Sequence, residues 1–295
     1  MAGRIEIGIP TVGRAAVLCG TLRALSAQTR PADRIIVCGA AADDVAGVAD
    51  ICPQATVLIT PPGLPRQRNA ILDAIAGRPG GDDIIVFFDD DFLPESGYLA
   101  AVERHMAADP DIVVATGNVL ADGIGGPGLT ADEAATILRR APAAGEGVHP
   151  AFASYGCNMA LRLAPTRVHG LRFDERLPLY GWQEDVDFSR RLGQFGQIVR
   201  LEAARGVHLG VKSGRGSGVR LGYSQVANPL YLAAKRRGYP LRRAISHLSC
   251  NIAMNLLRAA YPETYIDRRG RLRGNLIALK DLASGRMMPE RAAEL

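Results

Sequence analysis

The stretch Asp83-Ile84-Ile85-Val86-Phe87-Phe88-Asp89-Asp90-Asp91 decides the fold class of this chain. Its apolar residues, 84–88, indicate a strand that is buried on both faces, because a strand with one wet face alternates apolar and polar residues. Three aspartates end this strand abruptly. Adjacent carboxylates repel one another, and a divalent cation such as Mg²⁺ or Mn²⁺ commonly holds them together. A solvated acidic turn is the alternative interpretation.

Shorter predicted strands and helices alternate around this strand. Apolar and alternating runs predict strands at 4–9, 34–38, 55–59, 112–115 and 153–161, and helical spacing predicts helices near 65–76, 95–107 and 182–195. Such alternation implies βαβ units and an α/β fold with a mainly parallel sheet. Ligands of these sheets bind beyond the carboxyl ends of the strands, and the aspartates lie at such an end.

The second half of the chain has a different pattern. Residues 118–150 are rich in Gly, Pro and Ala and predict a surface excursion with one short helix at 131–140. Residues 206–222 hold six glycines and predict a mobile loop. From residue 223 onward the pattern is helical, and Ile245, Leu248, Ile252 and Leu256 share one face, which favours packing. We therefore expect a catalytic or binding domain at 1–222 and a helical extension at 223–295.

Composition places the protein among ordinary globular proteins, with 47% hydrophobic and 22% charged residues. The five cysteines are odd in number and lack paired CxxC spacing, so we expect reduced thiols rather than a disulfide framework or a zinc site. We expect neither an export signal nor a membrane span, because no apolar run approaches the ~18 residues that a span needs. These features favour a cytoplasmic protein.

Charge is distributed unevenly along the chain. Between Arg205 and Arg273 there are 14 Lys and Arg residues and two acids, a local net charge of +12 in a chain whose total is +5. The clusters Lys235-Arg236-Arg237 and Arg242-Arg243 predict contact with something anionic, such as the inner face of a plasma membrane or a lipid diphosphate. Solvated helix faces are the alternative. Nucleic acid is not expected, because no aromatic residues are interleaved with the basic ones.

Four segments, in this order and spacing, resemble the inverting GT-A glycosyltransferases of family 2, of the bacterial polysaccharide type. They are Ile5–Arg14, Arg66–Asn69, the aspartates 89–91 and the segment around Asp185, and the resemblance covers roughly residues 4–210. It implies a GT-A fold and an enzyme that moves a sugar from a nucleotide diphosphate to a hydroxyl group of a glycan or lipid-linked acceptor. It also implies Mn²⁺ or Mg²⁺ as cofactor.

The resemblance also assigns residues to the donor site. Pro10 and Thr11 would contact the nucleoside, with Arg14 and Asp90 nearby, and Arg68 would lie near the base or the diphosphate. Asp89 and Asp91 would hold the ribose and the metal ion, and His208 would be a third metal ligand. Lys212, Arg215 and Arg220, in the glycine-rich loop, could close over the diphosphate and exclude water. A surface cation on a helix is the alternative for Arg68, and a disordered basic loop is the alternative for Lys212 and Arg215.

The acceptor side rests on the segment Tyr180-Gly-Trp-Gln-Glu-Asp-Val-Asp-Phe188. By resemblance Asp185 would be the general base, and Glu184 would position the acceptor. Inversion needs a base on the face of the sugar opposite the leaving diphosphate, within reach of the acceptor hydroxyl. Trp182 could stack on a sugar ring, and Gly156 and Asn158 would also lie near the acceptor. An acidic helix start that satisfies the helix dipole is the alternative.

One departure from the family pattern concerns the base of the nucleotide. The family usually has an acid directly after the second strand, but here the chain reads Gly39-Ala-Ala-Ala42. Asp43 and Asp44 follow late, and Asp44 is our candidate for reading the base from a longer loop. A uridine diphosphate sugar is therefore favoured without being established.

Other classes fit the sequence less well. A nicotinamide-dependent dehydrogenase would need G-x-G-x-x-G after the first strand, and Gly8-Ile-Pro-Thr-Val-Gly13 lacks this spacing. An aspartyl-phosphate phosphatase would have a small hydroxyl residue soon after the acids, where Phe92-Leu-Pro94 stands. A nucleotidyltransferase usually has a glycine-rich basic first loop. It stays open as an alternative, as does a non-catalytic protein that binds nucleotide sugars.

Overall fold

The computed structural model describes residues 3–76, 82–212 and 217–295. They form two compact units. The first takes in the described residues of 1–62, 66–172 and 192–214, and the second those of 63–65, 173–191 and 215–295. Each unit is described by itself below.

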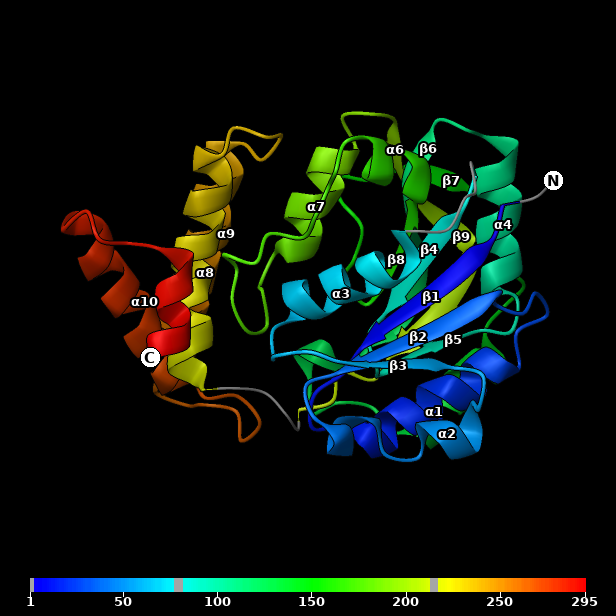
Figure 1. Cartoon of the computed structure of the whole chain (residues 1–295). Coiled ribbons are helices and arrows are strands. Elements are labelled where there is room, and N and C mark those ends of the chain that lie inside the picture. Colours follow the sequence, from blue (N-terminus) through cyan, green and yellow to red (C-terminus); the bar gives the residue numbers. More distant parts are fainter. Residues whose placement is uncertain (1–2, 77–81, 213–216) are drawn as a thin grey trace. The chain divides into compact units, whose positions relative to one another are not determined.

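A single mixed sheet forms the centre of the first unit (Figure 1). Its strands are β1 (Ile5–Pro10), β2 (Arg34–Gly39), β3 (Thr56–Ile59), β4 (Ile84–Phe88), β5 (Phe92–Pro94), β6 (Ile112–Asp122), β7 (Val148–Pro150), β8 (Asn158–Arg162) and β9 (Gln197–His208). Their order is β3-β2-β1-β4-β8-β6-β9-β5, and β7 pairs with β9. Strands β3, β2, β1 and β4 are mutually parallel, as are β6 and β9, whereas β5, β7 and β8 pair antiparallel. The predicted α/β class is confirmed.

Helices cover both faces of this sheet (Figure 1). They are α1 (Ala15–Ser26), α2 (Val48–Ile51), α3 (Leu64–Ala76), α4 (Tyr98–Ala108), α5 (Ala131–Arg140) and α6 (Leu163–Val168). On one face the isoleucines of β1 share a core cluster with Leu22 of α1 and Leu99 of α4. On the other face Gly8 of β1 lies against Phe87 of β4 and Ile71 of α3. A Cβ atom on Gly8 would be 2.7 Å from the Phe87 ring. A glycine is required there to let α3 approach the sheet.

Several strand and loop boundaries differ from the predictions. Strand β6 does not end at 115 but continues to Asp122, because its second half pairs with β9 from Asn118↔Arg205 to Asp122↔His208. Strand β8 begins at 158 rather than 153, and no bounds were predicted for β9. Helix 131–140 is confirmed, with a capping box in which Thr130 and Glu133 bond each other's backbone amides.

The second unit is helical, as predicted for the C-terminal part of the chain. It contains α7 (Glu184–Leu192) up to residue 191, followed by α8 (Gly218–Ala234), α9 (Leu241–Ala259), α10 (Arg268–Ala283) and a 3₁₀ turn η3 (Pro289–Glu294). Strand β9 ends at His208 and helix α8 begins at Gly218, so the predicted loop 206–222 is wrong for residues 206–208 and for residues 218–222, which include Arg220. The predicted domain boundary at 222/223 lies within this helix and stays a prediction.

Glycines bring α8 and α10 together. A Cβ atom on Gly222 would be 2.0 Å from the carbonyl oxygen of Arg271, and one on Gly274 would be 2.0 Å from that of Val219. Larger residues would therefore force the helices apart. Tyr223 lies in the small apolar core between the helices. In the described part of the chain no helix combines the length and apolar character needed to cross a bilayer.

Candidate active site

The three aspartates form the turn between β4 and β5. The amide of Asp89 donates to the carbonyl of Cys157 at 3.1 Å, and the amide of Leu209 donates to the carbonyl of Asp91 at 2.9 Å. These bonds attach the turn to β9 on one side and to the segment before β8 on the other. This turn separates Asp90 from its two neighbours.

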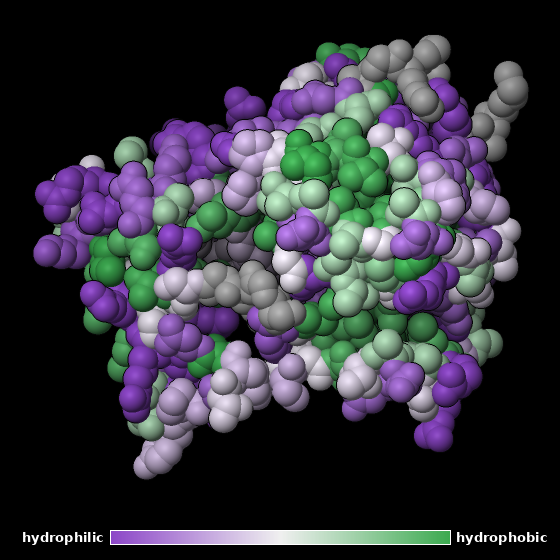
Figure 2. All heavy atoms as spheres, turned by 60° about the horizontal axis from the view of Figure 1, so that its bottom comes forward, coloured by the Kyte–Doolittle hydropathy of each residue, from purple (hydrophilic) through white to green (hydrophobic). Residues whose placement is uncertain are grey.

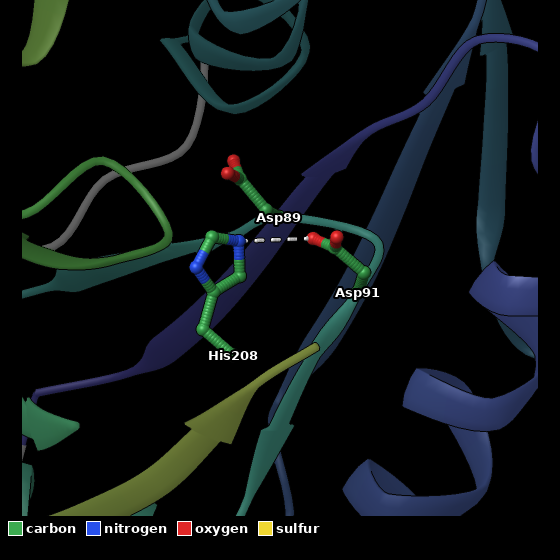
Figure 3. A group of neighbouring side chains, drawn as sticks. All are labelled: Asp89, Asp91 and His208. Carbon is green, nitrogen blue, oxygen red and sulfur yellow. Dashed lines mark ion pairs between the residues drawn. The ribbon is translucent and has the colours of Figure 1, made fainter. Parts of the chain in front are cut away.

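Asp89 and Asp91 lie beside His208, the last residue of β9 (Figure 3). One ligand atom from each of the three residues lies within 4.8 Å of the other two. Carboxylate oxygens are the ligands that Mg²⁺ and Mn²⁺ prefer, and a neutral imidazole adds a nitrogen ligand. The donor set therefore fits a divalent cation, and the predicted grouping of these three residues is what the structure shows.

His208 is held in one orientation by Asp122, the last residue of β6. Its Nδ1 lies 2.8 Å from a carboxylate oxygen of Asp122, and its Nε2 lies 3.3 Å from Asp91. The hydroxyl of Tyr155 donates to the second oxygen of Asp122 at 2.8 Å, and the Tyr155 ring meets the imidazole edge to face. A carboxylate on one imidazole nitrogen directs the other nitrogen toward a metal ion.

The electrostatics of this group favour a cation. Burial lowers the pKa of His208, but hydrogen bonds to Asp122 and Asp91 outweigh it and raise the pKa to about 10. Burial raises the pKa of Asp91, but the hydrogen bond with His208 outweighs it and the pKa is lowered. At neutral pH a proton on His208 thus balances the carboxylates. A divalent cation that binds there takes over this role and displaces the proton.

Asp90 belongs to a different, buried group. It is fully buried, it accepts a hydrogen bond of 2.7 Å from the Thr11 hydroxyl, and two nitrogens of Arg14 lie 2.6 and 3.1 Å from its oxygens. Burial raises the pKa of Asp90 to about 7, although Arg14 opposes this shift. Arg14 also lies 3.4 Å from Asp91. Asp90 therefore joins the turn after β1, where Pro10 ends the strand, to the aspartate turn. The predicted contacts of Pro10, Thr11, Arg14 and Asp90 with a nucleotide sugar stay predictions.

Arg68 of α3 is fully buried and holds Asp89. Its guanidinium donates to Asp89 at 3.2 Å and to the carbonyl of Gly156 at 2.7 Å, and it lies over the Phe87 ring. The surface-cation alternative for Arg68 is thereby wrong. Asn158, two residues after Gly156, accepts a hydrogen bond of 2.6 Å from Thr116 and is also fully buried. The donor role of Arg68 and the acceptor roles of Gly156 and Asn158 stay predictions.

Asp44 lies at the carboxyl ends of β1 and β2. Its carboxylate accepts hydrogen bonds from the amides of Gly13, Ala40 and Ala41 at 2.6, 2.8 and 2.9 Å. The late aspartate thus folds back to the turn after β1, next to the predicted nucleoside contacts. Its part in reading the base stays a prediction.

Lys212 is anchored rather than free. Its ammonium group donates to the carbonyls of Gly123 and Ile124 at 3.0 and 2.8 Å, in the turn directly after Asp122. The predicted closing of Lys212 over a diphosphate would require these bonds to break. Arg215, its expected companion, lies outside the described residues.

In the second unit, the segment before α7 adopts an unusual backbone. Leu179, Gly181 and Gln183 have φ angles of 58°, 60° and 70°. The left-handed region is strained for residues other than glycine, at about 1–3 kcal/mol each, and such strain persists only where the surroundings impose it. Glu184 and Asp185 follow at once, and Glu184 is buried. The strain thus lies next to the predicted general base.

Helices of the C-terminal region hold this turn in place. The side-chain amide of Gln183 lies 2.6 Å from Nδ1 of His247 in α9, and its oxygen accepts from the Tyr239 hydroxyl at 3.2 Å. Asn228 of α8 donates to the carbonyl of Trp182 at 2.8 Å. Residues some 45 to 65 positions downstream therefore determine the conformation of the predicted catalytic segment.

Two charged residues of this region have structural partners. Asp187 accepts from Arg191 at 2.8 Å and from Lys235 at 2.6 Å, and Lys235 also pairs with Asp174 at 2.8 Å. Lys235 is therefore an internal tie of the second unit rather than part of a surface that binds anions.

A sequence profile decides the family. The profile of Glycosyl transferase family 2 matches residues 6–158, which is more than half of the chain and includes the aspartate turn. This chain belongs to glycosyl transferase family 2. No curated protein matches the transferase at a significant level.

Solved structures show the GT-A fold of the transferase. GalNAc-T7, solved with UDP, GalNAc and Mn²⁺, aligns with 96% of this chain at a TM-score of 0.56 and 14% identity. TarS of S. aureus, residues 1–349, aligns over 96% of this chain and 92% of its own, at a TM-score of 0.52 and 13% identity. Glucosyl-3-phosphoglycerate synthase of Mycobacterium tuberculosis was solved with Mn²⁺, UDP and glucosyl-3-phosphoglycerate. It aligns over 81% of each chain, at a TM-score of 0.51 and 16% identity. The transferase spans 59% of the GalNAc-T7 chain.

Sequence reasoning missed several residues that shape the sites of the transferase. Asp122 lay in a segment that we assigned to a loop, and only its pairing with β9 brings it to His208. Gln183, His247 and Tyr239 carry no motif. A left-handed glutamine directly before two acids leaves no signal in a single sequence.

Proposed function

We propose that the transferase moves a sugar, with inversion, from a nucleoside diphosphate to a hydroxyl group of a glycan or lipid-linked acceptor. A uridine diphosphate sugar is the favoured donor. The observation that carries this proposal is the convergence of Asp89, Asp91 and His208 at the carboxyl end of β4 in a family 2 fold. GalNAc-T7 and glucosyl-3-phosphoglycerate synthase, which share the fold, were solved with Mn²⁺ and UDP.

The donor side of the proposal uses residues of the first unit. A divalent cation held by the three ligands would stabilise the negative charge that develops on the leaving diphosphate. Arg68 holds Asp89 in place through a hydrogen bond, and Asp122 directs Nε2 of His208 toward the cation. Thr11 and Asp44 border the turn where we propose that the nucleoside binds.

The acceptor side uses the segment at the start of α7. We propose Asp185 as the base that accepts the proton of the acceptor hydroxyl as the new bond forms, with Glu184 positioning the acceptor and Trp182 stacking on a sugar ring. A carboxylate is basic enough for this step, because the hydroxyl becomes acidic only during bond formation. The strained and firmly held backbone at Gln183 supports this assignment, since strain of this kind gathers at functional sites.

We further propose that the transferase works in the cytoplasm against an anionic membrane surface. The exposed pairs Arg236-Arg237 and Arg242-Arg243 support this, because each basic residue near an anionic leaflet adds attraction. A lipid-linked acceptor would be presented at the same surface.

A thermal-shift screen of nucleotide sugars, with and without Mn²⁺, tests the donor site, because a ligand of the native state raises the melting temperature. We expect at least one nucleotide sugar to stabilise the protein only when Mn²⁺ is present. Asp91→Ala should abolish that shift, whereas Asp132→Ala, which changes an exposed aspartate of α5, should preserve it. A shift that is independent of Mn²⁺ in the unchanged protein would count against the metal-dependent mechanism.

Hydrolysis of the donor found by this screen tests the base. Asp185→Asn should lose turnover and keep the Mn²⁺-dependent thermal shift, because the substitution removes a proton acceptor and leaves the donor site intact. Asp111→Asn, at an exposed position, is the control. Unchanged turnover in Asp185→Asn would remove Asp185 as the base.

A further inference from the structure

Helix α9 presents an apolar face to solvent. Leu256, Leu257 and Tyr261, just beyond its end, are 61%, 73% and 85% exposed, and Leu241, Ile245 and Met254 are also exposed. The predicted packing face 245/248/252/256 is therefore wrong for Ile245 and Leu256, although Ile252 does pack on the core of α8 and α10. Figure 2 shows hydrophobic side chains among hydrophilic ones on the left, where α8–α10 lie.

The exposed apolar residues form two adjacent stripes along α9. Leu241, Ile245 and Leu256 lie on one line, since four residues make about one turn and eleven make three. Met254 and Leu257, three residues apart, form the second line, and Tyr261, four residues further on, follows it just past the end of the helix. Small exposed residues lie between the two stripes, namely Ser246, Ser249 and Ala253. The face opposite carries Ala244 and Asn255, which are buried. The outward face thus carries two apolar stripes with a row of small side chains between them.

The charged residues of α9 and of the segment before it are all basic. The sequence contains no Asp or Glu between residues 203 and 262, a stretch that includes all of α8 and α9. Arg236, Arg237, Arg242 and Arg243 are exposed at and before the start of α9. An apolar helix face flanked by basic residues and free of acids is complementary to a surface with an apolar interior and anionic head groups.

A second copy of this chain fits the face poorly. Two α9 helices packed against each other would bury arginines with no acid of either helix to pair with them. Burying charges without partners is costly, and the cores of protein interfaces are depleted of charged residues. A bilayer imposes no such cost, because arginines reach the head groups while the apolar side chains enter the acyl boundary.

We propose that α9 lies flat in the head-group region of an anionic bilayer, with Leu256, Leu257 and Tyr261 inserted. The inference rests on the membrane contact proposed above. It identifies α9 as the element that makes this contact, and it holds that α9 inserts apolar side chains in addition to being attracted electrostatically. It does not depend on the transfer reaction.

A thiol probe reports insertion directly. Cys250 of α9 is exposed, and the other four cysteines are buried, so an environment-sensitive fluorophore attaches selectively there. We expect its emission to shift to the blue with vesicles of phosphatidylcholine and phosphatidylglycerol, and to stay unchanged with phosphatidylcholine alone. An unchanged emission with both kinds of vesicle would overturn the proposal.

Sedimentation of the unlabelled full chain with the same vesicles separates insertion from attraction. Leu256→Glu/Leu257→Glu should lose binding, and Arg242→Gln should weaken it about fivefold, the effect of one basic residue near an anionic surface. Val168→Glu, which places one glutamate on a comparably exposed apolar position of α6, should bind like the unchanged protein. Each variant should keep its melting temperature, because the substituted side chains are exposed.

Three results would count against α9 as an inserted helix. If the double leucine variant bound as well as the unchanged protein while arginine variants did not, the contact would be electrostatic only. If that variant turned a dimer into a monomer in gel filtration and vesicles bound neither form, the face would be a self-interface. Binding to an acidic protein or to RNA in place of vesicles would likewise overturn the proposal. Donor hydrolysis in the same samples reports separately on the transfer site.

Discussion

Replacing Asp122 by asparagine tests how His208 is prepared for a metal ion. The asparagine keeps the size of the side chain, and its oxygen can still accept the hydrogen bond of 2.9 Å from the Ile124 amide, so the local turn should persist. What is lost is the negative charge 2.8 Å from Nδ1 of His208. Nδ1 and the Ile124 amide contact the same oxygen of Asp122, so the asparagine oxygen can still accept from Nδ1, and the new amide nitrogen would face the Tyr155 hydroxyl.

The expected loss follows from the geometry. Removing a partner that orients a metal-binding histidine typically weakens metal affinity 10- to 100-fold. Asp122 is 29% exposed, and Asp91 still contacts the other nitrogen, so we expect the lower part of this range, about 10- to 30-fold. This corresponds to about 1.4–2 kcal/mol of binding free energy.

The assay is a titration of Mn²⁺ into the protein, in which electron paramagnetic resonance counts the free ion. Tyr155→Phe should cause a smaller loss, because it removes the hydroxyl that steadies Asp122 but leaves the carboxylate. Asp111→Asn, at an exposed position, is the matched control. The reasoning is refuted if Asp122→Asn binds Mn²⁺ as tightly as the unchanged protein while His208→Ala does not.

Three further predictions concern the buried polar groups. Burial raises the pKa of Asp174, but the hydrogen bond from Lys235 outweighs burial and lowers the pKa. This carboxylate therefore adds stability above about pH 4 that is lost as the pH falls. In urea unfolding, Asp174→Asn should match the unchanged protein in acid and be less stable at neutral pH. Burial lowers the pKa of His247, so its imidazole is neutral at neutral pH and can accept a hydrogen bond from Gln183. His247→Ala should therefore lower kcat for donor hydrolysis more than it lowers donor affinity. An equal loss of both would contradict this role. Arg68→Ala should lower the free energy of unfolding by about 3 kcal/mol, because it leaves the buried carbonyl of Gly156 unpaired and opens a cavity. A loss below about 1 kcal/mol would show that the site collapses around the change.

Local patterns predicted the elements that depend on nearby residues. The apolar run before the aspartates is β4, and the helix at 131–140 begins where Thr130 and Glu133 form a capping box. Both signals lie within a few residues of the structure they specify. The second half of β6 has no such signal, because residues 118–122 become a strand only through pairing with β9, more than 80 residues away.

The site divides in the same way. Carboxylates at the end of a buried strand need a counter-charge, so the sequence already indicated a cation near Asp89 and Asp91. The sequence did not indicate that a turn would bury Asp90 against Arg14, or that Lys212 would bond the carbonyls after Asp122. Those contacts depend on which backbone segments meet in the folded chain.

By itself, the sequence determined the alternation of strands and helices, the family, and the acidic residues at the rim of the sheet, because periodic burial and the repulsion of adjacent carboxylates act over a few residues. Only the tertiary structure decided that Asp122 orients His208, that α9 holds Gln183, and that Leu256 and Leu257 face outward. Each of these partnerships joins residues tens of positions apart or reflects which side of a helix is covered. The pairing of strands and the packing of helices set them, and no local propensity encodes them.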